Sequence, residues 1–279
     1  MKMEISKQDF EDAILVATSS HSEVFDTVKP HFLETYNLIK RSYLGDIGAK
    51  FFDETESFQP YLKRWVCLAT FVNVVRHLDL VLTPTGFGVV SNGEVSPASS
   101  ARVENLVEQV TQAVLVAVED AVCALIENAP GWGRTMQARR CVPTLLWGYR
   151  DYMQEASLSK LTSADWQVAQ NNIRLADDVL RRIISNEQMD ALLAKCRTGG
   201  PWTEQEQEAV CLIRTYLALN SNVPTFKPND MKHTLDRLRL LLDGDAETFA
   251  PYHASSEYKR NHFKPYENRK SAPAYIFNS

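Results

Sequence analysis

Apolar residues recur every three or four positions along most of this chain, and that spacing predicts a mainly helical protein. The longest run begins at Val103 and continues through Val107, Val110 and Val114. It predicts a single helix over residues 97–128, with Ser96 as its cap and Pro97 in its first turn. Because the second half of this helix is apolar on nearly all sides, we expect other helices to cover it on more than one side.

Shorter periodic runs predict further helices before and after the long one. They cover a short stretch after Ser6 and residues 22–44, 58–78, 162–185, 187–197, 203–219, 230–242 and 245–259. Ser6-x-x-Asp9 and Thr203-x-x-Glu206 have the form of capping boxes, which mark helix starts. Pro30 predicts a kink in the second helix, and Gly45 with Gly48 predicts its end. Residues 134–153 give no clear pattern because Pro143 interrupts them.

Residues 80–91, LVLTPTGFGVVS, depart from the helical pattern. Two runs of β-branched and aromatic residues flank Pro84-Thr85-Gly86, a combination that predicts a β-hairpin. Side chains alternate along a strand, so Phe87 and Val89 are expected on the same face. A two-stranded hairpin is marginal in water unless such a face is covered. The cover is either the protein's own long helix or a neighbouring subunit.

The predicted fold is a mainly α helical bundle with this hairpin and an extended C-terminal tail. We divide the chain into a first helical half at 1–156, a second at 157–262 and a tail at 263–279. The tail holds the strand-like run Tyr275, Ile276 and Phe277. The pattern [S/T]-x-x-D-[F/W]-x-x-A begins at both Ser6 and Thr162, which is typical of two similar halves and equally of two ordinary helix starts.

Charge and composition restrict the partners. The net charge of −5 gives no overall field that would attract nucleic acid or an anionic membrane, so the expected partners are proteins. The first twenty residues carry four acids and no signal-peptide pattern. The most apolar window, 113–126, is interrupted by Glu119 and Asp120, and we expect it not to span a membrane. The protein is therefore expected to fold in the cytoplasm.

Five cysteines, an odd number without a C-x-x-C pair, indicate free thiols, and most of them lie in apolar helical runs. We interpret them as buried. No catalytic, metal or cofactor motif is present, so we expect no enzyme activity and no cofactor. Asp177-Asp178 resembles half of a magnesium-binding helix motif, but Arg181 stands one turn further on. A solvated charged face is the favoured interpretation.

Trp132, Arg134, Arg139 and Arg140 form a local aromatic and basic cluster. Because of this cluster and the basic residues between Glu257 and Lys270, incidental contact with DNA stays an open alternative. A short basic tail on an acidic protein is more often a docking segment for an acidic partner or a solubilising end.

The run from Leu82 to Ser91, followed by Pro97-Ala98-Ser99 and a helix with Arg102, resembles a family of uncharacterised proteins encoded by tailed phages and prophages of gut bacteria. Tyr266-Glu-Asn-Arg269 followed by Ile276-Phe277 is also similar to the end of that family. The resemblance implies a virion structural protein of the head–tail connector or neck type.

The expected function is therefore a non-enzymatic subunit of a homo-oligomeric ring, located in the virion, with portal or tail components as further partners. Its expected contact residues are Phe87, Val89, Tyr275, Ile276 and Phe277. Two alternatives stay open from the residues alone. One is an all-α enzyme that uses Asp177 and Asp178 with magnesium, and the other is a host-side helical scaffold protein.

Overall fold

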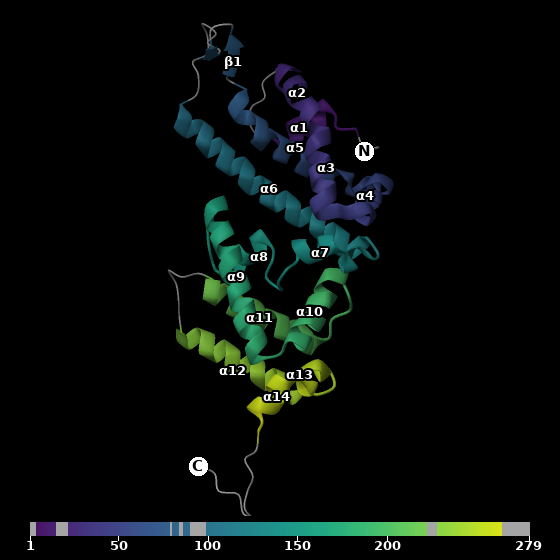
Figure 1. The fold of residues 1–279 in the computed structure, drawn as a ribbon, viewed down its shortest axis with the longest axis vertical. Helices are drawn as coiled ribbons and strands as arrows, with labels where there is room; N and C mark the ends of the chain where they lie inside the picture. The colour runs from purple at the N-terminus through teal and green to yellow at the C-terminus, as the bar shows by residue number, and fades with distance from the viewer. Residues whose placement is uncertain are drawn as a thin grey trace, which may run out of the picture.

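The computed structural model describes residues 4–14, 22–78, 80–83, 86–89, 99–221 and 228–263. In these ranges the chain is mainly helical, as predicted, with two four-residue strands, β1 (Leu80–Thr83) and β2 (Gly86–Val89). The molecule is elongated, and the strands lie at the end opposite to α14 (Ser256–Asn261) (Figure 1). One hydrophobic core runs through both helical halves.

Short helices form the N-terminal part. They are α1 (Lys7–Ala13), α2 (Ser22–Val28), η1 (Lys29–His31), α3 (Phe32–Ile39), η2 (Lys40–Leu44), α4 (Gly45–Glu54), η3 (Glu56–Phe58), α5 (Gln59–Val74) and η4 (Val75–His77). The capping box at Ser6 is confirmed: the Ser6 N–H donates to Asp9 Oδ2 at 2.8 Å, and the Asp9 N–H donates to Ser6 Oγ at 3.1 Å. Pro30 falls in the turn η1, which divides the helix predicted over 22–44, because proline cannot donate the helical hydrogen bond.

Gly45 ends the preceding helical segment, as predicted, whereas Gly48 does not. Gly45 is the C-cap of η2 and takes a positive φ of 63°, a conformation that suits glycine, and α4 begins there and continues to Glu54. Gly48 lies inside α4, where a Cβ would be 3.2 Å from Trp132 Cδ1. The second glycine therefore allows α4 to pack closely on Trp132.

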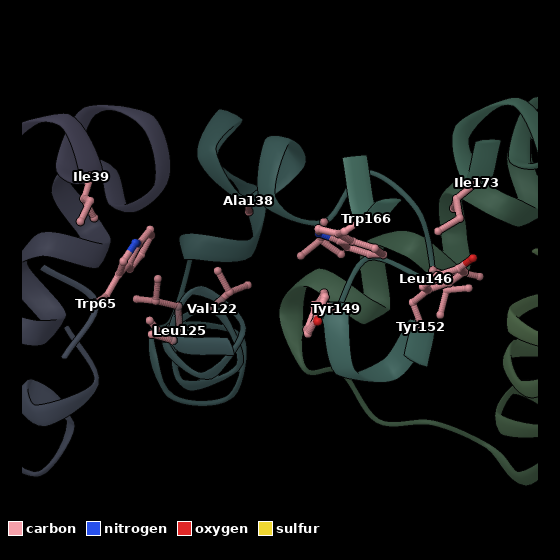
Figure 2. Packing of buried hydrophobic residues seen from close by; sticks show 14 of the residues in the cluster. Ile39, Trp65, Val122, Leu125, Ala138, Leu146, Tyr149, Tyr152, Trp166 and Ile173 are labelled. Carbon is pink, nitrogen blue, oxygen red and sulfur yellow. The ribbon is translucent and has the colours of Figure 1, made fainter. Parts of the chain in front are cut away.

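The long helix α6 (Ser100–Asn128) connects the two halves of the molecule. It packs on α5 along one side, while α8 (Tyr149–Glu155), α9 (Ser163–Ile183) and α10 (Asn186–Thr198) contact it elsewhere, which confirms the expected cover. Figure 2 shows this arrangement, with Trp65 of α5 on one side of Val122 and Leu125, and Tyr149 of α8 beyond their other side.

By length and composition alone, α6 is long and apolar enough to cross a membrane despite Glu119 and Asp120. About 39% of the 18-residue window that meets this criterion is buried inside the protein. Core helices of soluble proteins also have this length and composition, and α6 alone is weak evidence for a membrane protein.

The remaining elements before residue 157 are η5 (Trp132–Arg134), which contacts α6, and α7 (Met136–Cys141), which contacts η2. The C-terminal half is completed by α11 (Glu204–Ser221), α12 (Pro228–Gly244) and α13 (Ala250–Ala254). The capping box at Thr203 is confirmed, since the Thr203 N–H donates to Glu206 Oε2 and the Glu206 N–H donates to Thr203 Oγ1. The helix predicted over 245–259 is instead divided at Ser255, which caps α14.

Candidate functional site

The strands β1 and β2 pair antiparallel, with Leu80 opposite Val89 and Leu82 opposite Phe87. In the part of the chain that the structure describes, each strand pairs only with the other. Each therefore has one edge whose backbone groups have no strand partner there, and such an edge can accept a strand from another chain. Figure 1 shows both strands at one end of the molecule, beyond α5 and before α6.

The predicted contact residues fall into two groups. Phe87 and Val89 belong to β2, and the backbone register brings each opposite a leucine of β1. Tyr275, Ile276 and Phe277 lie outside the residues that the structure describes. The proposed tail contact consequently stays a prediction.

A second feature is the joint between α6 and the C-terminal half, where a glutamate of α6 holds the start of α9. Glu108 Oε1 accepts a hydrogen bond from the Ser163 backbone N–H at 2.7 Å, and Glu108 Oε2 accepts one from the Ser163 hydroxyl at 2.7 Å. The N-terminal N–H groups of a helix have no partner within it. The Thr162 hydroxyl accepts from the Asp165 N–H, so Glu108 and Thr162 bind different N–H groups of the same first turn.

Glu119, eleven residues further along α6, does the same for α8. Its Oε2 accepts a hydrogen bond from the Arg150 backbone N–H at 2.9 Å. The N-cap residue of α8 is Gly148, which has no side chain to provide a cap. A Cβ on Gly148 would lie 2.8 Å from Glu119 Oε1, so the carboxylate occupies the space that a larger cap residue would need.

An ion-pair network surrounds this contact. Arg150 donates to Asp120 Oδ1 at 2.6 Å, and its Nε lies 3.5 Å from Glu119 Oε1. Asp120 Oδ2 lies 3.8 Å from Arg64 of α5. Asp120 of α6 thus connects α5 with α8.

The two glutamates have opposite pKa shifts. Burial raises the pKa of Glu119, and its hydrogen bonds with Arg150 offset this only in part. Burial also acts to raise the pKa of Glu108, but the hydrogen bonds from Ser163 outweigh it and leave that pKa below its usual value. Both residues act as structural anchors, because each is bound to the start of a helix.

Asp177 and Asp178 do not form a solvated face together, as the sequence had suggested. Asp177 is buried and pairs with Arg181 at 2.6 Å, and Arg181 also pairs with Asp190 at 2.7 Å. Asp178 is exposed. In the described residues no group of three or more His, Cys, Asp or Glu side chains is placed to hold a metal ion. This arrangement gives the magnesium-enzyme alternative no support.

The cysteines are only partly buried, which corrects the prediction. Cys67 is buried, Cys123, Cys141 and Cys196 are half-buried, Cys211 is exposed, and none forms a disulfide. Cys196 and Cys211 both line a groove of about 510 Å³ that Trp202 also lines.

The ring of Trp132 is not accessible for stacking on a nucleic-acid base. The Trp132 ring is fully buried, and its Nε1–H donates to the carbonyl oxygens of Tyr43 and Leu44. An aromatic ring that stacks on a nucleic-acid base must be accessible. Trp132 is a core residue, whereas Arg139 and Arg140 are exposed.

Sequence reasoning missed Glu108 and Glu119 as anchors. They lie 55 and 31 residues from their partners, and no local pattern connects them. One signal was available, since an acid in the middle of an otherwise apolar helix is buried only with a partner. Glu119 interrupts the apolar half of α6 in that way.

Comparison with known proteins gives one match. Residues 28–142 match the model of a family described as a family of unknown function (DUF6712). The matched segment includes β1, β2, Glu108 and Glu119. No curated protein and no solved structure matches the chain.

Proposed function

We propose that this protein is a non-enzymatic virion subunit of the head–tail connector or neck type, which assembles into a homo-oligomeric ring and contacts other virion proteins such as portal or tail components. The observation that carries the proposal is the strand pair at one end of an elongated helical molecule (Figure 1). Open strand edges bind neighbouring chains by strand addition. The resemblance of residues 82–102 and 266–277 to a phage family supports the virion assignment.

The proposal gives the hairpin and the C-terminal tail a common task. Phe87 and Val89 of the hairpin, and Tyr275, Ile276 and Phe277 of the extended tail, contact adjacent subunits. The α6 joint supports this because it makes the body rigid: Glu108 and Glu119 bind α9 and α8 directly to the helix that follows β2 in the chain. The proposed duplication of residues 1–156 and 157–262 accounts for the size.

The test compares three forms of the full chain by analytical ultracentrifugation and negative-stain electron microscopy. The first is the wild type, for which we expect rings. The second is F87K/V89K, and the third lacks residues 274–279. A matched control is L33K, which places a lysine at an exposed leucine of α3.

The outcomes separate the alternatives. A folded monomer that no longer enters rings, with L33K assembling normally, supports the hairpin and tail contacts. Loss of soluble monomer in F87K/V89K means that the hairpin is covered by its own chain. Variants that fold and assemble like the wild type contradict the contact assignment. A host-side scaffold would be absent from purified particles, which an antibody against the protein tests directly.

A further inference from the structure

Helix α9 has two apolar faces, and only one of them is buried. The buried face packs in the C-terminal half and consists of Trp166, Ala169, Ile173, Ala176 and Leu180. The other face carries Val168, Leu175 and Val179, which are 59%, 65% and 47% exposed. A surface helix normally has polar residues on its outer face, so three exposed aliphatic side chains in line indicate a contact surface.

The outer face has the spacing of a coiled-coil seam. Its residues follow one another at intervals of three and four: Asp165, Val168, Asn172, Leu175, Val179 and Arg182. This is the a and d pattern of a heptad repeat. An acid lies at the start of the seam, a base lies at its end, and the aliphatic side chains lie between them.

The seam is complementary to the seam of a second copy that runs antiparallel to it. If two α9 helices run antiparallel, Asp165 of one lies opposite Arg182 of the other. The same register places Val168 opposite Val179, and Asn172 opposite Leu175. A parallel pair would instead place like charges together at both ends, which costs free energy.

We propose that two copies of this protein associate through α9 as an antiparallel helix pair, with Asp165 and Arg182 forming ion pairs at both ends and Val168, Leu175 and Val179 buried between them. The partner is a second copy of this protein, because Asp165 at one end of the seam is complementary in charge to Arg182 of an antiparallel copy. The contact is isologous, so it closes after two copies. It goes beyond the proposed ring contacts, which are heterologous and involve the hairpin and tail.

The environment of α9 allows this contact. Asp165 and Arg182 are both exposed, and the aliphatic residues between them are exposed as well. Asn172 is half-buried and donates a hydrogen bond to the Ser221 carbonyl oxygen at 3.2 Å, so this position of the seam also contacts the end of α11. A single helix pair buries less surface than a standard interface, so we expect a weak, concentration-dependent dimer.

The first experiment is sedimentation velocity over a concentration series with the full chain. We expect V168E/V179E to weaken dimer formation at least tenfold, because it places four carboxylates in the seam. The control is L240E, which changes an aliphatic residue that is 78% exposed on α12 and should leave dimer formation unchanged. Equal melting temperatures show that the fold is intact.

The second experiment tests the register by disulfide formation in a C211S background, which removes the exposed native thiol. Two copies of residue 168 are about 16 Å apart along the seam in the antiparallel register, too far for a disulfide. V168C alone and V179C alone should therefore stay uncrosslinked under mild oxidation. An equal mixture of the two should give a covalent dimer.

Three results would overturn the proposal. They are a wild type that stays monomeric at all concentrations, a V168E/V179E variant that associates as tightly as the wild type, and crosslinking of V168C with itself. Because ring assembly through the hairpin does not require residue 168 or 179, failure of the α9 contact leaves the proposed function standing, and the reverse also holds.

Discussion

Glu108 binds Ser163 through both of its carboxylate oxygens, at 2.7 Å to the backbone N–H and 2.7 Å to the hydroxyl. The contact joins the middle of α6 to the first residue of α9. Hydrogen bonds to an ionised carboxylate are stronger than those between neutral groups. Glu119 makes the equivalent contact with α8, so a single helix fixes the direction in which two others leave it.

Replacing Glu108 by alanine should lower the free energy of unfolding by about 1–2 kcal/mol, the usual range for the loss of a helix cap. The change leaves the Ser163 N–H without its partner. Urea unfolding followed by circular dichroism measures the effect. E104A is the matched control, because Glu104 is exposed one turn earlier on α6 and accepts from the Ser100 hydroxyl of its own helix. An equal loss in both variants would contradict the anchoring role.

The Glu108 contribution should depend on pH. Burial opposes ionisation, but the Ser163 hydrogen bonds prevail and hold the pKa of Glu108 below its unfolded value. A depressed carboxyl pKa stabilises the fold above the unfolded pKa of about 4.3, and this stabilisation is lost as the pH falls through the folded pKa. The stability difference between wild type and E108A should thus be largest near neutral pH and shrink in acid. Urea unfolding of the wild type and E108A, near neutral pH and in acid, tests this.

Gly148→Ala should destabilise the protein by about 1–3 kcal/mol, because the new methyl group would overlap Glu119 Oε1. The carboxylate cannot move away without losing its bond to the Arg150 N–H. Gly244→Ala is the control, since a Cβ there meets nothing within 4 Å. Thermal unfolding compares the two. If both alanines are tolerated equally, the close approach of Gly148 to Glu119 is not needed for the fold.

Local signals in the sequence predicted local structure well. The capping boxes at Ser6 and Thr203 form as expected, and Pro30 divides a helix. Gly48 was misread because its role depends on Trp132, which lies 84 positions later and becomes a neighbour only in the fold. Likewise, Asp177 was expected at the surface because the pattern of acids does not show that Asp177 is buried and paired with Arg181.

The two candidate contact surfaces also differ in how far the sequence predicts them. The pairing of β1 with β2 sets Leu82 opposite Phe87 and Leu80 opposite Val89, a register that the sequence pattern alone does not specify. The α9 seam, in contrast, was hidden by the buried stripe of the same helix, since two apolar faces on one helix blur the period of each. Only the exposed fractions of Val168, Leu175 and Val179 distinguish the faces.

Thiol labelling should find one fast cysteine among the five. Cys211 is exposed, whereas burial raises the pKa of Cys67, Cys123 and Cys141 to about 12 and keeps them protonated at neutral pH. A thiol reagent at pH 7.5, read by mass spectrometry, should modify Cys211 first. C211S should abolish the fast phase. Rapid modification of Cys67 in the native protein would contradict its burial.

Asp177 and Asp178 should behave differently when each is replaced by alanine. D177A removes the 2.6 Å partner of Arg181 inside the protein, and we expect a loss of about 1–3 kcal/mol in unfolding free energy. The loss is limited because Asp190 still binds Arg181 at 2.7 Å. D178A, which changes the adjacent exposed residue, should alter stability by no more than about 0.5 kcal/mol.

Magnesium should leave the melting temperature of the wild type unchanged, because Arg181 already neutralises Asp177. A magnesium-dependent rise in melting temperature that disappears in D177A/D178A would instead assign these carboxylates to a metal site.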